Sequence, residues 1–541
     1  MIAIYLYILL LTLQSIGANI PEQDLNLDKH KEKILVVGPL FASHPRLWYH
    51  VTKDLSKNKN YEVYQLLPID SPYTEKVKAN GVIPILNRNL TQSIIKDYEE
   101  KMKINDVQID DMITYSVAIV KSFYSNEDLI NQIKSIKFDM IVCGPFPEAE
   151  LIANTLQIPL YIRLVISNPD STMQTMLKQH ASHSSQSHTS RTTLFGMEKH
   201  KGFNSLTGSF LTRLKSKLSE YLFLGIYFEI IFYKHHQVIP EHLKLEATTF
   251  RAPDLILYSG FEGLSPPLAL SPNSRIIPFI SEDESVHQEI PKELQEFMNR
   301  HEKLILIAFG TIQNPTNQTL REISNFMEKR TDYGFIYATR NKGYFESSIF
   351  EKIERLENVY VAKWLPQTQI LNNPKVQIFF SHGGQSSYIE SIEAEKPLVV
   401  IPVLAMDQYF VCEYVHAQKL GACVFKPDAY HINEMVNYVE QNNDIKNRVK
   451  ILKKMIEKKR QQGLDLLYWV DYLMDIRTTE FLQANQYQYF NKFQLYDLDV
   501  NIAIALIVIA IVALFIALMK QIYNIVTCKK DKNVSKSLKI D

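Results

Sequence analysis

The residues best suited to chemistry lie between Trp364 and Gln408, where a histidine and two glycines follow an apolar run. The segment reads WLPQTQILNNPKVQIFFSHGGQSSYIESIEAEKPLVVIPVLAMDQ. Glycines at the start of a helix let a ligand approach free backbone N–H groups at the positive end of the helix dipole. A neighbouring histidine can donate a hydrogen bond to a phosphate oxygen. The pattern therefore indicates a site for a phosphorylated ligand.

Other side chains of this segment fit the remaining parts of a nucleotide sugar. Trp364 can stack on a planar base, and Glu390 can accept hydrogen bonds from a ribose diol. Asp407 and Gln408 can bind sugar hydroxyls. A single tryptophan is more often a core residue and a single helical glutamate is more often solvated, but their combination with the histidine favours a nucleotide-sugar site.

A strand, a helix and a second strand must position these residues. Val376–Phe380 has the length and composition of a buried strand, and Ser386 or Ser387 can cap a helix that runs to about Glu395. Leu398–Val403 is a second apolar run. Two buried strands joined by a helix predict a parallel βαβ unit, whose crevice lies at the carboxyl ends of the strands.

The order W-x-P-Q, [ST]-H-G-G, a helical Glu and a final Asp-Gln resembles the signature of the UDP-glycosyltransferases, which include membrane-bound UDP-glucuronosyl and UDP-glucosyl transferases. The resemblance implies an α/β protein of GT-B fold: two Rossmann-like parallel-sheet domains facing across a cleft, plus one C-terminal transmembrane helix. It also implies further donor-binding residues. Gln367 would lie near the base, and the phosphates would contact Thr311, His382, Gly384 and Ser386, where the family usually has Asn in place of Ser386.

A second histidine follows the first predicted strand, Lys33–Val37. Ser43-His44-Pro45 precedes an amphipathic helix that ends near Leu55, with Ser43 as its expected N-cap. A histidine with a pKa of about 6.5 can take a proton from an alcohol near neutral pH, although a histidine in a loop is more often simply polar. The resemblance places the catalytic base at His44.

The family's second catalytic residue is an Asp that orients this base, and its position here is Gly144. Three alternatives follow: His44 works without that partner, another carboxylate such as Glu148 serves, or the chain is a catalytically weak or silent UDP-sugar-binding homologue that acts as a partner subunit. A Rossmann oxidoreductase is a further alternative, which the lack of G-x-G-x-x-G after a strand disfavours.

The reaction that the resemblance implies moves a hexosyl or glucuronosyl group from a UDP-sugar to a hydroxyl of a small lipophilic acceptor, with inversion. The UDP-sugar is a co-substrate, and no cofactor or metal ion is implied. The 59 basic and 59 acidic residues cancel, so no nucleic-acid partner is expected, while a homo-oligomer stays open. Four scattered cysteines are too few for a disulfide scaffold.

Both ends of the chain carry apolar segments. Residues 1–18 read as a signal peptide, with an uncleaved anchor as the alternative. Ile502–Met519 is free of charge and six lysines follow it, which predicts a transmembrane helix over 501–523 and a cytosolic tail over 524–541. The chain would be a single-pass type I membrane protein, and the resemblance implies the endoplasmic reticulum with luminal catalytic domains.

Domain boundaries are predicted from composition. The acidic stretch that begins at residue 281 separates an acceptor-binding domain, 19–280, from a UDP-sugar-binding domain with a returning helix, 281–490. Asn89-Leu90-Thr91 and Asn317-Gln318-Thr319 are N-glycosylation sequons on the predicted luminal side, which permits a glycoprotein.

Overall fold

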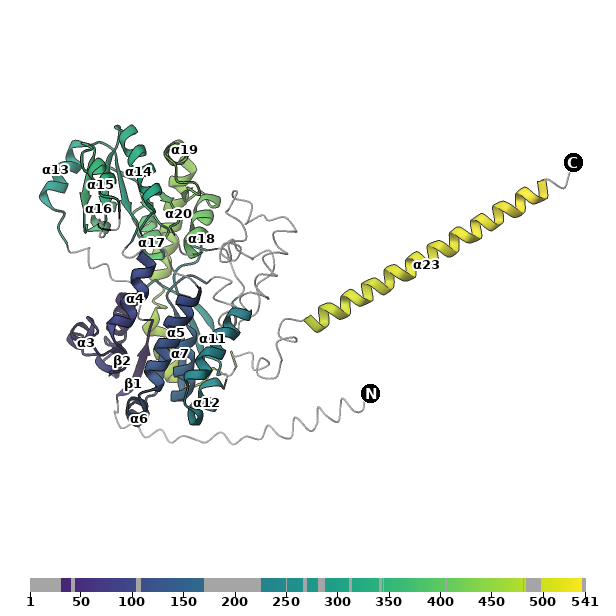
Figure 1. The fold of residues 1–541 in the computed structure, drawn as a ribbon, viewed down its shortest axis with the longest axis horizontal. Helices are drawn as coiled ribbons and strands as arrows, with labels where there is room; N and C mark the ends of the chain where they lie inside the picture. Colours follow the sequence, from purple (N-terminus) through teal and green to yellow (C-terminus); the bar gives the residue numbers. More distant parts are fainter. Residues whose placement is uncertain are drawn as a thin grey trace.

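The chain folds into two parallel β-sheets with flanking helices and one long helix that stands apart from them (Figure 1). This computed structural model describes residues 31–39, 44–103, 109–169, 225–249, 251–265, 270–280, 288–310, 314–339, 343, 345–403, 406–479, 481–482 and 498–537. Thr311, the predicted signal peptide and the acidic stretch that begins at residue 281 therefore lie outside the described residues.

The first sheet has seven strands in the order β3-β2-β1-β4-β5-β6-β7, all parallel. Its strands are β1 Glu32–Val37, β2 Tyr61–Pro68, β3 Ile83–Asn87, β4 Met140–Cys143, β5 Leu160–Val165, β6 Leu255–Ser259 and β7 Ser274–Ile277. The strand order reverses between β1 and β4. A crevice at the carboxyl ends of these two strands is where open α/β sheets bind ligands.

Helices cover both faces of this sheet, because alternate residues of each strand point to opposite sides. In β1, Ile34 and Val36 belong to one apolar core, which includes Trp48 of α2, whereas Leu35 and Val37 belong to another, which includes residues of α5, α6 and α7. The helices are α2 His44–Leu55, α3 Thr74–Ala79, α4 Gln92–Lys103, α5 Ile109–Tyr124, α6 Glu127–Ile136, α7 Pro147–Leu156, α11 Gly225–Val238 and α12 Glu241–Thr248.

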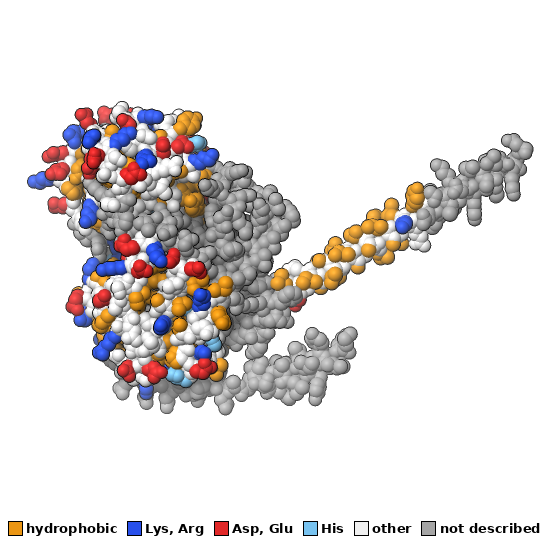
Figure 2. All heavy atoms as spheres, viewed as in Figure 1, with side chains coloured by type: hydrophobic (Ala, Val, Ile, Leu, Met, Phe, Trp, Pro, Cys, Tyr) orange, Lys and Arg blue, Asp and Glu red, His pale blue; other side chains and the backbone are white. Residues whose placement is uncertain are grey.

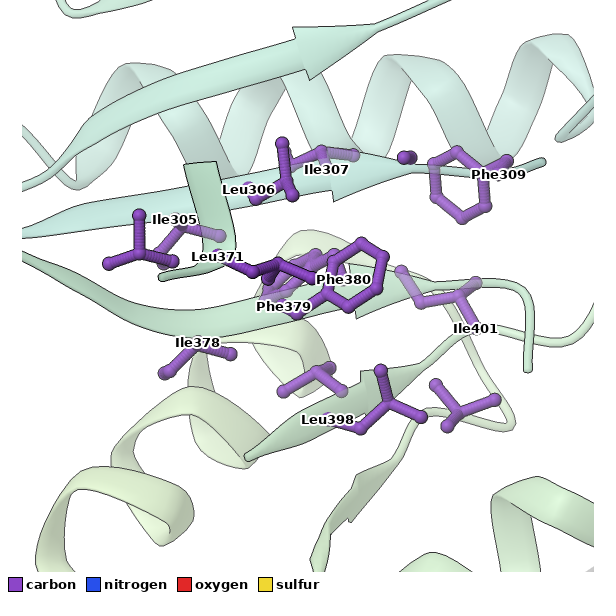
Figure 3. Packing of buried hydrophobic residues seen from close by; sticks show 14 of the residues in the cluster. Ile305, Leu306, Ile307, Phe309, Leu371, Ile378, Phe379, Phe380, Leu398 and Ile401 are labelled. Carbon is purple, nitrogen blue, oxygen red and sulfur yellow. The ribbon is translucent and has the colours of Figure 1, made fainter. Parts of the chain in front are cut away.

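The second sheet has six parallel strands in the order β10-β9-β8-β11-β12-β13. They are β8 Leu304–Ala308, β9 Gly334–Ala338, β10 Val359–Ala362, β11 Val376–Ser381, β12 Leu398–Val400 and β13 Gly421–Cys423. The order reverses between β8 and β11, so this sheet also has a switch-point crevice. Phe309 and Ile401, which follow β8 and β12, lie at that end of the packed core (Figure 3).

Helices of the second half connect these strands, and one of them returns to the first sheet. They are α13 Lys292–Arg300, α14 Asn317–Lys329, α15 Ser347–Glu354, α16 Gln367–Leu371, α17 Gln385–Glu393, α18 Met406–Ala417, α19 Ala429–Gln441, α20 Asn443–Arg460 and α21 Leu466–Ile476. Leu466, Val470 and Leu473 of α21 pack into the first-sheet core beside α2. The expected returning helix is thus present, and it ties the two halves of the chain together.

Helix α23, Leu498–Ser537, contains a stretch, Leu498–Tyr523, that is long and apolar enough to cross a membrane. The most apolar part of this stretch has a mean hydropathy of 3.4, and none of it is buried against the other described residues. Apolar side chains line the helix, whereas acidic and basic side chains mix over the visible face of the two sheet-containing bodies (Figure 2). Length and composition alone make α23 a candidate membrane anchor.

One expectation about local structure needs correction. Neither Ser386 nor Ser387 caps α17: the N-cap is Gly384, whose extended backbone (φ −63°, ψ 145°) places both serines inside the first turn. Helix α2 begins at His44, directly after the expected N-cap, Ser43, which lies outside the described residues. The predicted strands Lys33–Val37 and Val376–Phe380 are confirmed within one residue at each end.

Candidate functional site

A tight turn after β11 carries the predicted phosphate-binding residues. Gly383 has a φ of +92°, a conformation that L side chains rarely adopt, and a Cβ there would lie 2.9 Å from Cγ1 of Val400. The same Cβ would lie 3.3 Å from the backbone oxygen of Gln408, so the start of α18 packs directly against the turn. The turn, the end of β12 and the start of α18 thus form one compact unit.

His382 sits between two glycines at the switch point of the second sheet. A Cβ at Gly310, which follows β8, would lie 2.7 Å from Cε1 of His382, and one at Gly384 would lie 2.6 Å from Nε2. Any side chain larger than hydrogen at either position would push the imidazole aside. The two glycines therefore hold the ring where β8, β11 and α17 meet, as a phosphate site requires.

The protonation state of His382 follows from its surroundings. Desolvation lowers its pKa to about 4, so the ring is neutral near pH 7. Ser381 Oγ lies 3.3 Å from Nδ1 and also accepts the Gly383 N–H at 3.3 Å. The Ser381 hydroxyl can then donate to Nδ1, and in that tautomer the imidazole proton is on Nε2, the nitrogen beside the first turn of α17. In this arrangement the neutral His382 ring can donate a hydrogen bond to a ligand.

The first turn of α17 offers backbone donors to the same place. No side chain caps this helix, so the N–H groups of its first turn are left for water or a ligand. Ser386 is half-buried in that turn. Free N–H groups, the positive end of the helix dipole and a neutral imidazole together suit a diphosphate.

The predicted base and ribose contacts also come together. Trp364 is 46% exposed, which leaves its indole face open to a ligand, and its Nε1 donates to Gln288 Oε1 at 3.3 Å. Gln367, the first residue of α16, donates from Nε2 to Oε2 of Glu390 at 2.5 Å. Gln367 thereby orients the glutamate that the sequence assigns to the ribose.

The pair after β12 is placed differently from its sequence expectation. Gln408 is buried, at 3% exposure, and its Oε1 accepts the Val403 N–H at 2.9 Å, so this oxygen braces the preceding loop. Asp407 lies in the first turn of α18, and its side chain is outside the described residues. The structure therefore positions the backbone of this pair beside the turn at 383, which leaves the contacts with a sugar as a prediction.

A disulfide between Cys412 and Cys423 joins α18 to β13. The two cysteines are buried, and their Cα atoms lie 4.8 Å apart. The sequence spacing excluded a disulfide scaffold and gave no sign of this pair, because the contact depends on how α18 packs. The bond fixes the helix whose start abuts Gly383.

His44 lies at the start of α2, at the carboxyl end of the first sheet. Its ring meets the ring of Phe146 edge to face, with centroids 6.0 Å apart. Leu47, one turn on, packs against the second-sheet core, whereas Trp48 lies in the first-sheet core. Helix α2 therefore begins where the two halves of the molecule meet, which is the place for a base that acts on a substrate held between them.

Trp48 and Pro39 pack around the two glycines at the ends of β1 and β4. The indole of Trp48 is 1% exposed and covers Gly38, where a Cβ would lie 2.3 Å from the ring. A Cβ at Gly144 would lie 2.7 Å from Pro39 Cδ and at an ordinary contact distance, 3.5 Å, from the same indole. Sequence reasoning missed these contacts. A side chain at 144 would therefore require Pro39 to shift.

Glu148, the suggested substitute for that aspartate, has a different partner. Its Oε2 accepts a hydrogen bond from Ser116 Oγ at 2.8 Å, and Ser116 Oγ lies 3.0 Å from Nε2 of His235. Glu148 also lines a pocket at the carboxyl end of the first sheet, together with Phe146. Sequence reasoning did not find Ser116 or His235, which lie on separate helices far apart in the chain.

Two desolvated histidines, His382 and His235, predict how stability depends on pH. Burial lowers the pKa of His382 and of His235 to about 4, below the ordinary 6.5, so the unfolded chain binds more protons than the folded one between these values. Their stabilising contribution is complete above pH ~6.5 and is lost as the pH falls through the folded pKa. We expect the thermal unfolding midpoint to fall between pH 7 and pH 5, and the fall to be smaller in His382→Asn and His235→Asn. Scanning fluorimetry measures both; an equal fall in all three proteins contradicts the prediction.

The fold and the paired switch-point sites define a glycosyltransferase of the GT-B class. The Medicago truncatula glycosyltransferase UGT71G1, solved in complex with UDP-glucose, matches 83% of this chain and 98% of its own, with a TM-score of 0.55 and 15% identity. The calicheamicin glycosyltransferase CalG4 matches 79% of this chain and 95% of its own, with a TM-score of 0.51 and 14% identity. The chain belongs to the UDP-glucoronosyl and UDP-glucosyl transferase family, whose model matches residues 48–534.

Curated relatives agree with this family. The chain is 22% identical to UDP-glucuronosyltransferase 3A1 of Xenopus laevis over 526 residues, which cover 91% of this chain and 94% of that protein. It is 28% identical to the putative UDP-glucuronosyltransferase ugt-48 of Caenorhabditis elegans over 248 residues. That second match covers 44% of this chain and spans only 45% of the relative's length.

Proposed function

We propose that the protein transfers a hexosyl or glucuronosyl group from a UDP-sugar to a hydroxyl of a small lipophilic acceptor, with inversion at the anomeric carbon. The observation that carries the proposal is the turn at 381–384, where a neutral imidazole and the uncapped start of α17 converge. These groups suit the diphosphate, whose negative charge grows as the sugar leaves.

The remaining donor contacts follow from the same half of the chain. Trp364 stacks on the uracil, and Glu390, oriented by Gln367, accepts hydrogen bonds from the ribose. Asp407 and Gln408 bind the sugar, and Thr311 binds the phosphates. UDP then leaves while its charge is held by donors that are already in place, which lowers the barrier to transfer.

The acceptor is placed in the first half, where His44 takes the proton of its hydroxyl as the oxygen attacks the anomeric carbon. A single direct displacement of this kind inverts the configuration. His44 acts without an aspartate at position 144, which is a glycine in this chain. An imidazole without such a partner still serves as a base, with less control over its tautomer.

The experiment that tests the function is a transfer assay on the full-length protein in detergent. Radiolabelled UDP-glucose, UDP-glucuronate and UDP-galactose are each offered with a panel of phenols and sterols, and His44→Ala is the control. We expect one donor to be consumed and a glycoside of inverted configuration to form. UDP binding without product from any pair would favour the silent partner subunit, which no finding supports so far; nicotinamide dinucleotide binding without UDP binding would favour an oxidoreductase.

We also propose that α23 anchors the protein as a single-pass type I membrane protein of the endoplasmic reticulum, with residues 1–18 as its signal peptide. The support is the uncharged window over Ile502–Met519 and the six lysines that follow it. Protection of the luminal domains from added protease in sealed microsomes, with loss of a C-terminal tag, tests this topology. We also propose that the protein can form a homo-oligomer, which can be tested on the same microsomal preparation.

A further inference from the structure

The pocket in the first half has a single charged group on its wall. It opens at the carboxyl ends of β1, β2 and β3, between α5 and α7. Its polar lining residues are Asn87, Tyr115, Ser122 and Glu148, and the others are apolar or glycine. Asn87 donates to Ser122 Oγ at 3.2 Å, and Ser122 donates to the backbone oxygen of Ile119 at 2.7 Å. The Asn87 and Ser122 side chains are therefore hydrogen-bonded within the wall, and Glu148 is the charged residue of the pocket lining.

Side chains from two other helices, α5 and α11, position the Glu148 carboxylate of α7. Ser116 on α5 donates to Oε2 at 2.8 Å, and Nε2 of His235 on α11 lies 3.0 Å from the same hydroxyl. His235 is fully buried, and its Nδ1 has no hydrogen-bond partner among the described residues. Among the described residues, the His235 ring therefore makes one hydrogen bond, between its Nε2 and Ser116 Oγ.

The direction of these hydrogen bonds depends on the protonation state of Glu148. Burial raises the pKa of this carboxyl group, and the hydrogen bond from Ser116 acts in the opposite direction. In the ionised form the carboxylate only accepts, so Ser116 donates its hydroxyl hydrogen to it. The Ser116 oxygen then accepts from Nε2–H of His235, which burial keeps neutral with a pKa of about 4. The chain of donors runs from His235 through Ser116 to Glu148 and ends on an acceptor in the pocket wall.

Phe146 connects the pocket with His44, because Phe146 lines the pocket and its ring centroid lies 6.0 Å from that of His44. Helix α2, which begins at His44, packs into the core on one face, and α5 and α7 pack into the core on the other. Ser116 binds Glu148 on the α5 side. A molecule that offers one hydroxyl to His44 would therefore meet Glu148 with a different part of its structure.

We propose that Glu148, positioned by Ser116 and His235, binds a second hydrogen-bond donor on the acceptor molecule, a hydroxyl or a protonated amine. The acceptor class is thus an apolar body with a reacting hydroxyl and a second donor group apart from it. This rests on the proposed function, because it assumes that the pocket receives the acceptor. The apolar wall of the pocket contacts the apolar part of the acceptor. The Glu148 carboxylate distinguishes acceptors of the same size by whether they carry the second donor group.

Three phenols test the proposal: 4-pentylphenol, 4-(5-hydroxypentyl)phenol and 4-(5-aminopentyl)phenol. They share the reacting phenol and differ only at the end of the tail. Titration calorimetry on the full-length protein in detergent, with UDP present, measures binding whether or not sugar is transferred. We expect the hydroxyl and amine probes to bind about tenfold more tightly than 4-pentylphenol, since a hydrogen bond to a charged group is stronger than one between neutral groups.

Variants separate the role of the carboxylate from that of the pocket. Glu148→Gln keeps the shape and should reduce the preference for the amine, and Glu148→Leu should remove both preferences. Glu75→Gln, whose side chain is 82% exposed, should leave them unchanged. Equal binding of the three probes by the native protein, or preferences that survive in Glu148→Leu, would overturn the proposal. Selective binding without transfer of sugar would instead count against the proposed function.

Discussion

Replacing His44 by alanine is expected to lower kcat for sugar transfer by about 10²–10⁴-fold, the usual contribution of a general base. The loss should fall on kcat, because His44 stands at the first sheet and takes no part in the turn that we assign to UDP. UDP affinity, measured by titration calorimetry, should stay the same.

His242→Ala is the matched control for this prediction. His242 lies on α12 with its side chain 62% exposed, far in sequence from either switch point. Its replacement should change neither kcat nor UDP affinity. Transfer at the native rate in His44→Ala would show that the base is another group and would remove the catalytic role from the start of α2.

Gly384→Ala is expected to weaken UDP binding by about tenfold to a hundredfold while the protein stays folded. The backbone of Gly384 has a φ of −63°, which alanine adopts readily, so no conformational strain arises. The added methyl would lie 2.6 Å from Nε2 of His382 and must push the imidazole out of its place. Each tenfold loss of affinity corresponds to about 1.4 kcal/mol of binding free energy.

Gly343→Ala provides the control, because a Cβ there would have no heavy atom within 4 Å. Its UDP affinity and thermal unfolding midpoint should match those of the native protein. Calorimetry with UDP alone measures the effect without any assumption about the sugar or the acceptor. Native affinity in Gly384→Ala would mean that the diphosphate does not lie beside His382.

The donor half could largely be predicted from sequence because its signals are local. Buried parallel strands appear as short apolar runs such as Val376–Phe380, and a His-Gly-Gly turn after such a run lies at the carboxyl end of the sheet by geometry alone. The cap of α17 was misassigned since serine is a common N-cap, whereas here glycine takes the extended conformation that leaves the first N–H groups open.

The acceptor half depends on contacts between distant residues, which single-sequence patterns do not contain. Trp48 packs closely over Gly38 and Pro39 packs against Gly144, and the spacing of residues gives no sign of this packing. Ser116, Glu148 and His235 come from three helices, and the outer two residues are 119 positions apart. Their meeting depends on how helices pack on one face of the sheet.

The bond between Cys412 and Cys423 also bears on how the chain matures. Such bonds form in oxidising compartments and are rare where glutathione keeps thiols reduced. Under the type I topology that we propose, both sheets lie on the oxidising side of the membrane, where this link between α18 and β13 can form. Translocation and cross-linking of the second half of the chain would then be linked events.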